Sequence, residues 1–277
     1  MWFVNGLLNF LPQFWLVMLL PLMLALPFRR HRVTLLSAAP FAAVLLVMGG
    51  ARTLSADGQA CEAPTLRVAT ANVLMSNDRL PELARDILDQ APDVVVFEEL
   101  RHDLEDFSPE LALAYPYRIS TATRWMTLAS RLPLEDARRL TLEVDAPGRE
   151  PLAAEVRVGG QTVTVLAVHA QPPLSASTYR LHQQQYARLA EEAQAAEGPV
   201  IALGDFNATV FSPLFARFVW SNGLRVASDN EPTHFPRRNL GLRIDHVLVR
   251  DVGVCEERVF DLTGSDHRGV AVGVHIG

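Results

Sequence analysis

Residues 201–208 read IALGDFNA, an apolar run that ends in Gly204, Asp205, Phe206 and Asn207. A short apolar run bounded by turn residues indicates a buried strand. Taken alone, an Asp and an Asn just after a strand are most simply explained as a turn held by an Asx hydrogen bond. They indicate a functional site only because the same arrangement is found at several other places along the chain.

Five further segments combine an apolar run with polar side chains at its end: VATANV (68–73), DVVVFEEL (93–100), VLAVHAQPP (165–173), RIDHVLV (243–249) and GSDHRGV (264–270). The ends of neighbouring strands meet at one edge of a sheet, where ligand sites of α/β proteins commonly lie. We therefore expect one shared site built from Asn72, Glu99, His169, Asp205, Asn207, Asp245, Asp266 and His267.

Helical and strand patterns interleave across the second part of the chain. Apolar residues at helical spacing predict a helix over 79–90, and a polar helix is expected over 177–196. Strands are expected at 65–73, 94–97, 127–130, 140–144, 153–158, 163–169, 200–203, 244–249, 254–260 and 269–276. This order favours mixed sheets packed face to face with helices outside them.

The 277-residue chain divides by composition near residue 60. Residues 61–277 hold 30 of the 31 acidic and 21 of the 25 basic residues, so the formal charge of this domain is −9. Proteins that bind duplex DNA through many phosphates usually present a basic face. The acidity therefore argues against a general nuclease.

Residues 1–60 have the composition of a membrane anchor followed by a linker. Two uncharged stretches, 7–28 and 33–50, are long enough to be transmembrane helices. The loop between them carries Arg29, Arg30 and Arg32, and short Arg-rich loops tend to stay in the cytoplasm. We expect a transmembrane hairpin in the cytoplasmic membrane, with the domain facing the periplasm or cell exterior. A single span and a cleaved signal peptide are the alternatives.

The six polar-ended segments resemble, in order, the motifs of the endonuclease/exonuclease/phosphatase family, part of the DNase I-like superfamily. GDFN and the closing SDH are the most specific of them. The resemblance implies a four-layered α/β sandwich, two packed mixed β-sheets flanked by helices, over residues 61–277. It also implies a metal-dependent phosphoric ester hydrolase, here a membrane-anchored bacterial member.

By the same resemblance, Glu99, Asn72 and Asp266 would bind a divalent metal ion, with Glu98 competing for the role of Glu99. Oxygen ligands of this kind suit Mg²⁺ or Mn²⁺. In the family pattern a Gln often precedes the metal-binding Glu, so Glu98 stands where that Gln would be.

The remaining motif residues match the family's catalytic positions. Asp205 and Asn207 would orient and activate the attacking water, and His267, held by Asp245, would bind the scissile phosphate. His169 matches a second phosphate-facing histidine, and the two histidines and the metal would together neutralise charge on the phosphate. His234, in the Pro-flanked segment 232–236, stands where the family often has a substrate-contacting Trp.

Two departures from the family pattern bear on substrate. Leu74 follows Asn72 where the nuclease branch often has a polar residue, and Trp125 begins the segment WMTLASR (125–131), in which the family's usual small residues have changed. The catalytic set is retained, but the wall of the pocket should differ.

Three functions are compatible with these observations. The first is a phosphatase or phosphodiesterase that uses water as nucleophile on a phosphoester substrate beside the lipid bilayer, where a lipid-linked phosphate is one candidate. The second is an extracytoplasmic endonuclease or exonuclease, which would make nucleic acid a partner. The third is a catalytically silent, membrane-tethered binding module.

The chain has two cysteines, Cys61 and Cys255. The first and last strands are neighbours in the family fold, so the resemblance makes a disulfide between them plausible. Two unrelated buried cysteines are the alternative.

Overall fold

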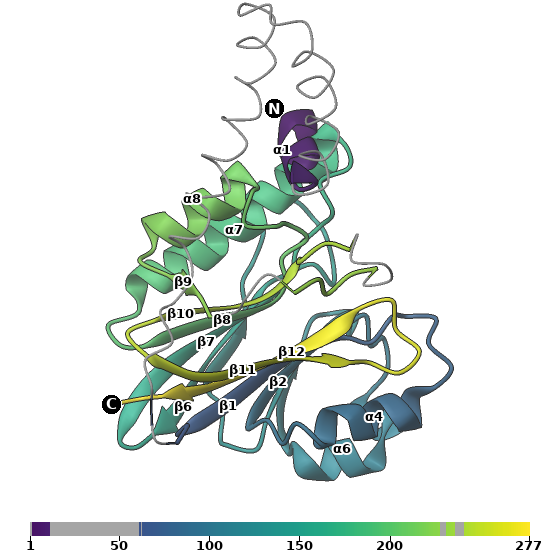
Figure 1. The fold of residues 1–277 in the computed structure, drawn as a ribbon, viewed down its shortest axis with the longest axis vertical. Coiled ribbons are helices and arrows are strands. Elements are labelled where there is room, and N and C mark those ends of the chain that lie inside the picture. Colours follow the sequence, from purple (N-terminus) through teal and green to yellow (C-terminus); the bar gives the residue numbers. More distant parts are fainter. Residues whose placement is uncertain (1, 12–60, 62, 228–230, 236–240) are drawn as a thin grey trace, which may run out of the picture.

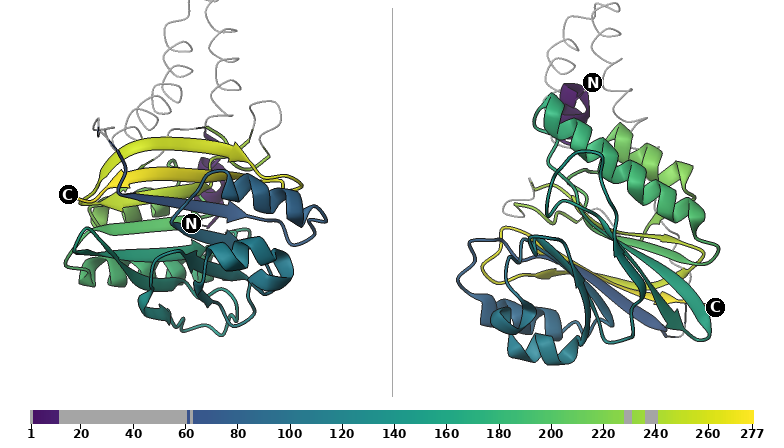
Figure 2. Two further views of the ribbon diagram at one scale, coloured as in Figure 1. Left: turned by 90° about the horizontal axis from the view of Figure 1, so that it is seen from below. Right: turned by 180° about the vertical axis from the view of Figure 1, so that it is seen from behind.

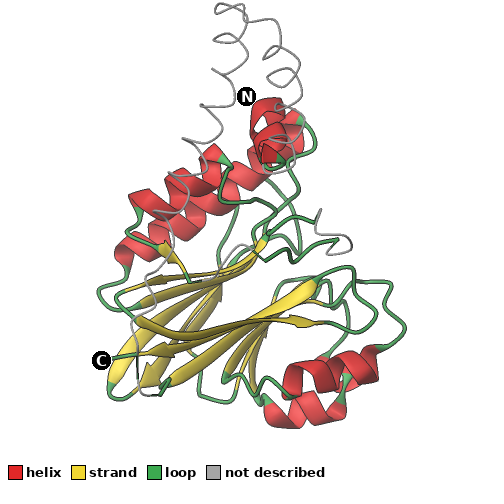
Figure 3. Cartoon of the chain, in the orientation of Figure 1, coloured by secondary structure: helices red, strands yellow, loops and turns green. Residues whose placement is uncertain are grey.

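The computed structural model describes residues 2–11, 61, 63–227, 231–235 and 241–277. Two six-stranded sheets pack face to face, and helices cover both outer faces (Figures 1 and 3). The expected four-layered α/β sandwich is confirmed.

The first sheet has the strand order β11-β12-β1-β2-β4-β3. Its central strand, β1, pairs in parallel with β2 and antiparallel with β12, so the first and last strands of the domain are neighbours. The bounds are β1 Leu66–Asn72, β2 Val94–Glu98, β3 Tyr117–Ser120, β4 Met126–Ser130, β11 Gly253–Asp261 and β12 Arg268–His275.

The second sheet has the order β5-β6-β7-β8-β10-β9. β7 and β8 are parallel, and β10 runs antiparallel to β8. The bounds are β5 Glu135–Arg139, β6 Leu152–Val158, β7 Gln161–His169, β8 Val200–Asp205, β9 Arg225–Val226 and β10 Asp245–Arg250.

Buried aliphatic residues fill the space between the sheets, including Val68, Val96, Val165, Leu203 and Val247. Two further clusters lie between each sheet and its helices. Because both faces of each central strand are covered, every residue of β2 and of β8 is buried. This explains why these strands appear in the sequence as continuous apolar runs without alternation.

The helices form the two outer layers (Figure 2). α4 Leu80–Leu88, α5 Leu104–Phe107 and α6 Pro109–Ala114 cover the first sheet, and α7 Ala176–Ala195 and α8 Pro213–Ser221 cover the second. A capping box between Ser175 and Thr178 starts α7. The short N-terminal helix α1, Trp2–Leu8, lies against α8.

One expected strand is wrong. Residues 140–144 are irregular, and the edge strand β5 precedes them at Glu135–Arg139. β5 has the sequence EDARR and is mostly exposed, so it has no apolar pattern that would reveal it. Its pairing with β6, and the ion pair between Glu135 and Arg157 at 3.0 Å, stabilise it instead.

Within the described part of the chain, no helix has both the length and the apolar character needed to cross a membrane. Residues 7–10 pack on the domain as the end of α1 and the turn after it. The remainder of the expected spans 7–28 and 33–50 lies outside the described residues, apart from Leu11, and the hairpin stays a prediction.

Cys61 and Cys255 form a disulfide, with their Cα atoms 5.2 Å apart. Cys255 lies in β11, and Cys61 lies just before β1. The neighbouring positions of the first and last strands therefore bring together cysteines that are 194 residues apart in sequence.

Candidate active site

The polar residues at the strand ends meet at one edge of the sandwich. In the second sheet, His169 of β7 and Asp245 of β10 are both register partners of Asp205 in β8. In the first sheet, Asn72 of β1 is the partner of Glu98 in β2. The predicted convergence of these motifs on one site is confirmed.

Gly204 explains why the GDFN motif begins with glycine. Its φ is +140°, and a Cβ atom there would lie 1.9 Å from the carbonyl oxygen of Val168 in β7. Only glycine permits this close approach of the two strands. The approach sets Asp205 beside His169.

Asn72 links the two sheets at the site. Its Nδ2 lies 3.4 Å from Oε1 of Glu99 and 3.3 Å from Oδ2 of Asp205, and donates to both carboxylates. Its Oδ1 accepts from the backbone N–H of Leu74 at 3.2 Å. In this arrangement Asn72 positions the two carboxylates, and its oxygen is already engaged.

The structure distinguishes Glu98 from Glu99. Glu98 is fully buried, and its Oε1 accepts from the Thr70 hydroxyl at 2.6 Å and from the Asp205 backbone N–H at 3.2 Å. Glu99 has a φ of 62° and lines the cavity. The chain therefore presents Glu99 to a ligand and uses Glu98 to support Asp205.

Asp205 and Asn207 form a compact unit. Oδ1 of Asp205 accepts from the Asn207 backbone N–H at 2.8 Å, and Oδ2 lies 3.1 Å from Asn207 Nδ2. Asn207 Nδ2 also donates to the carbonyl oxygen of Ala170 at 2.9 Å. Burial and the nearby Asp245 carboxylate raise the pKa of Asp205 to about 7.

His267 and Asp245 form a buried pair. His267 Nδ1 lies 2.9 Å from Oδ2 and 3.2 Å from Oδ1 of Asp245. Burial disfavours the imidazolium, but the charge and hydrogen bond of Asp245 outweigh it and raise the pKa of His267 to about 10. His267 is therefore a cation at neutral pH.

His169 has the opposite character. Its Nε2 lies 3.6 Å from Oδ2 of Asp205 and 3.9 Å from Oε1 of Glu99, and its ring stacks on Trp125 with the ring centroids 5.7 Å apart. Burial, followed by the positive charge of Arg149, holds the pKa of His169 well below its usual value. A neutral His169 would contribute a hydrogen bond, and the positive charge expected from the two histidines would come from His267.

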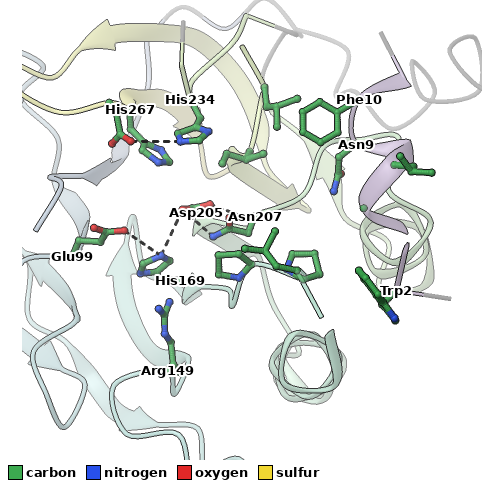
Figure 4. Close-up of a pocket in the computed structure, with 18 of the residues that line it drawn as sticks. Trp2, Asn9, Phe10, Glu99, Arg149, His169, Asp205, Asn207, His234 and His267 are labelled. Atoms are coloured by element: carbon green, nitrogen blue, oxygen red, sulfur yellow. Dashed lines mark hydrogen bonds and ion pairs between the residues drawn. The ribbon is translucent and has the colours of Figure 1, made fainter. Parts of the chain in front are cut away.

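Arg149, which the sequence analysis missed, supplies positive charge near His169. It lines the cavity (Figure 4), and its guanidinium lies 4.9 Å from the centroid of the Trp125 ring. Its Nη1 is buried without a hydrogen-bond partner in the described residues. An unpaired buried guanidinium nitrogen beside a site of this kind suits an anionic ligand.

Gln185 of α7 fixes the backbone around these groups. Its Nε2 donates to the carbonyl oxygens of Arg149 at 2.8 Å and His169 at 3.1 Å. Its Oε1 accepts from the Gln171 N–H at 2.7 Å. One fully buried side chain thus holds two separate segments of the site.

Asp266 lies next to His234, with 3.6 Å between Oδ2 and His234 Nε2, and both residues line the cavity. The His234 ring also packs on the His267 ring at a centroid distance of 4.5 Å. His234 thus lies beside the other motif residues, and its contact with substrate stays a prediction.

The site fits a hard divalent cation. The carboxylates of Glu99 and Asp205 converge on Asn72, and Oδ1 of Asp266 is buried without a hydrogen-bond partner in the described part of the chain. Among the described His, Cys, Asp and Glu residues, two groups of three bring ligand atoms within 4.8 Å of one another: His234, Asp266 and His267, and Asp205, Asp245 and His267. Glu99 belongs to neither group, so metal binding by Glu99, Asn72 and Asp266 together stays a prediction.

These residues form the polar end of a cavity of about 560 Å³ (Figure 4). Its other end is apolar and includes residues of α1 and the segment 172–174. The sequence does not reveal this role of α1, because residues 1–60 as a whole have the composition of a membrane anchor and linker.

Residues 69–267 match the sequence profile of the Endonuclease/Exonuclease/phosphatase family. The chain belongs to this family. Membership assigns it to a group of phosphoester hydrolases and accounts for the shared order of the motifs. No curated protein sequence matches the chain.

Several solved structures share the fold. An endonuclease/exonuclease/phosphatase from Beutenbergia cavernae is 22% identical, with a TM-score of 0.64, over 76% of this chain and 72% of that one. A 3′ phosphatase from Neisseria, bound to product DNA hairpin, is 23% identical, with a TM-score of 0.60, over 75% and 98%. Sphingomyelinase C from Streptomyces griseocarneus is 19% identical, with a TM-score of 0.56, over 76% and 99%.

Proposed function

We propose that this family member is a divalent-metal-dependent phosphatase or phosphodiesterase, tethered to the cytoplasmic membrane, that hydrolyses a lipid-linked phosphoester with water. The observation that carries the reaction class is the convergence of Glu99, Asp205 and the His267–Asp245 pair on one cavity. Retention of the complete set argues against a silent binding module.

Glu99, Asn72 and Asp266 would hold Mg²⁺ or Mn²⁺, and Asn72 also fixes the Glu99 carboxylate. When bound, such an ion polarises a phosphoryl oxygen and offsets its negative charge. His267, as a buried imidazolium, would donate to a phosphate oxygen, and Arg149 would add a second positive charge. These groups together would stabilise the negative charge on the phosphoryl oxygens in the transition state.

Asp205 would accept the proton of the attacking water. A base is most effective when its pKa is close to the working pH, and the pKa of Asp205 is about 7. Asn207 donates to Asp205 and fixes the carboxylate. Neutral His169, whose Nε2 faces both carboxylates, would donate a hydrogen bond to the phosphate.

Two observations support an extracytoplasmic position for the domain. The Cys61–Cys255 disulfide is typical of proteins that fold in an oxidising compartment. The Arg-rich segment 29–32 favours a cytoplasmic loop between two spans, with both ends of the hairpin outside.

The formal charge of −9 beyond residue 60 and the apolar end of the cavity favour a lipid-linked substrate over DNA or RNA. The shared fold does not distinguish a lipid substrate from a nucleic acid, because both a 3′ phosphatase bound to DNA and a sphingomyelinase have this fold. An extracytoplasmic nuclease is therefore the second candidate.

The test is hydrolysis by the full chain with Mg²⁺ or Mn²⁺, and with excess chelator, of plasmid DNA, an aryl phosphodiester and a polyprenyl or phospholipid phosphate. We expect metal-dependent turnover of the aryl ester and the lipid phosphate. DNA cleavage at a comparable rate would support the nuclease, and no turnover of any substrate would contradict a hydrolase. C-terminal reporter fusions test the topology, and a reporter active only in the cytoplasm would overturn it.

A further inference from the structure

Two buried polar residues, Asn5 in α1 and Asn9 just after it, attach this segment to the domain. Asn9 Oδ1 accepts from the backbone N–H of Thr209 at 2.8 Å. Asn5 Oδ1 accepts from the Ser212 hydroxyl at 3.1 Å and from the Leu214 N–H at 3.3 Å. These partners lie in the loop that follows Asp205 and Asn207 and in the first turn of α8, so the N-terminal segment is fixed beside the catalytic motif.

Four large apolar side chains of residues 2–10 are left out of the core. Trp2, Phe3, Leu7 and Phe10 are 38%, 59%, 41% and 44% exposed, and Leu174, which also lines the cavity, is 79% exposed. A helix that docks through asparagines while large apolar groups remain in solvent offers those groups to a ligand. They line one continuous cavity with Glu99, His169 and Asp205 (Figure 4).

We propose that α1 and residues 172–174 bind the hydrocarbon chain of the substrate, whose phosphate lies at the Glu99, Asp205 and His267 end of the same cavity. This inference rests on the proposed hydrolase function and specifies an amphiphilic phosphoester, with an alkyl or prenyl chain on the ester oxygen. The continuity between the apolar wall and the polar end is the reason to assign the hydrocarbon to the substrate.

The size of the cavity is consistent with such a ligand. Pockets for small molecules commonly enclose about 300–1,000 Å³, and this one encloses about 560 Å³. A phosphoester with a small leaving group would not reach the apolar residues at the far end of the cavity. Each CH₂ group buried against the wall should raise kcat/KM about fourfold.

The experiment compares water-soluble nitrophenyl phosphodiesters with methyl, butyl and hexyl chains, using the full chain with Mn²⁺. For the unmodified protein we expect kcat/KM to rise steeply from methyl to hexyl. Phe10→Ala and Leu174→Ala should each lower the hexyl-to-methyl ratio by about tenfold, since each removes apolar contact with the chain. Leu174 is highly exposed, so Leu174→Ala should not disturb the fold. It therefore tests the inference even if Phe10→Ala fails to fold.

Trp220→Ala is the matched control. Trp220 is 78% exposed on α8 but does not line the cavity, so its loss should leave the ratio unchanged. Equal turnover of methyl and hexyl esters would overturn the inference while leaving the hydrolase function intact. The inference would also be overturned if Phe10→Ala and Leu174→Ala released the protein from vesicles without changing the ratio. Failure to hydrolyse any of the esters would instead contradict the proposed function.

Discussion

Asp245 Oδ2 lies 2.9 Å from Nδ1 of His267, inside the sandwich and away from bulk water. A buried carboxylate at this distance keeps the imidazole protonated across the physiological pH range. Asp245→Asn retains the shape of the pair but removes the charge. We expect kcat/KM at pH 7 to fall by about a hundredfold or more.

An NMR titration of the His267 ring checks the cause of that loss. The pKa of His267 should fall from about 10 towards its ordinary value in Asp245→Asn, while the melting temperature stays close to that of the unmodified protein. Full activity in this variant would remove His267 from the phosphate-binding role.

Glu99→Gln should weaken binding of Mn²⁺ by about tenfold or more, because a neutral amide replaces a charged oxygen ligand. Calorimetric titration of the metal gives this result independently of turnover. Glu82→Gln, on the exposed side of α4, is the control and should bind Mn²⁺ normally. If Glu99→Gln binds Mn²⁺ as tightly as the control, the metal lies elsewhere.

Gln185→Leu leaves the carbonyl oxygens of Arg149 and His169 and the N–H of Gln171 without their buried partner. The free energy of unfolding should fall by about 2–3 kcal/mol, because unsatisfied buried polar groups cost about 1–3 kcal/mol each and the neighbours relax in part. kcat/KM should fall as well, since Arg149 and His169 lose their fixed positions. Urea unfolding and steady-state kinetics measure both effects.

The neighbouring residue Gln183 provides a control, because it is exposed on the same helix. Gln183→Leu should change the free energy of unfolding by no more than about 0.5 kcal/mol. Equal changes in the free energy of unfolding for the two substitutions would show that the hydrogen bonds of Gln185 do not stabilise the fold.

His182 should make stability depend on pH. It is fully buried, with Nδ1 2.6 Å from the Gln171 carbonyl oxygen, and burial lowers its pKa to about 4. The unfolded chain takes up this proton near pH 6.5, whereas the folded chain does so only near pH 4. The stability that a neutral His182 allows is thus present above pH 6.5 and is lost as the pH falls to 4. Over this interval the free energy of unfolding should fall by about 3 kcal/mol.

Urea unfolding between pH 7 and pH 4 measures this slope. His182→Asn should reduce the loss of stability over the interval, while His275→Asn, at an exposed residue of β12, should leave it as it is. An identical slope in all three proteins would exclude His182 as the source.

Cys255→Ser should lower the free energy of unfolding by about 2–4 kcal/mol, because the disulfide closes a long loop in the unfolded chain. The unmodified protein in strong reductant should behave in the same way. Maleimide labelling of the untreated full chain should find no free thiol. Rapid labelling of both cysteines without reductant would argue against the disulfide and weaken the extracytoplasmic placement.

Much of the fold could be predicted, because the central strands are covered on both faces and appear as long apolar runs. The motif residues could be placed because strand ends share an edge, as His169, Asp205 and Asp245 do in register. β5 could not be predicted, since an exposed charged edge strand carries no periodic signal.

The missed parts of the site depend on contacts between distant segments. Arg149 lies in a loop whose position depends on Gln185, which is 36 residues away, so its local sequence gives no indication of a ligand. Asp245 keeps His267 protonated, whereas burial and the charge of Arg149 favour a neutral His169, and only the structure shows these surroundings. Trp125 is an intermediate case, because the altered segment 125–131 predicted a changed pocket wall but not its stacking on His169.

The docking of α1 restricts how the intervening chain can cross a membrane. α1 precedes residues 12–60 and the domain follows them, yet Asn9 and Thr209 are hydrogen-bonded. Residues 11 and 61 therefore lie on the same side of any membrane beside the domain, as the predicted hairpin requires. On opposite sides, the apolar wall and the phosphate-binding groups would be in different compartments. The complete cavity can form only when the two share a compartment.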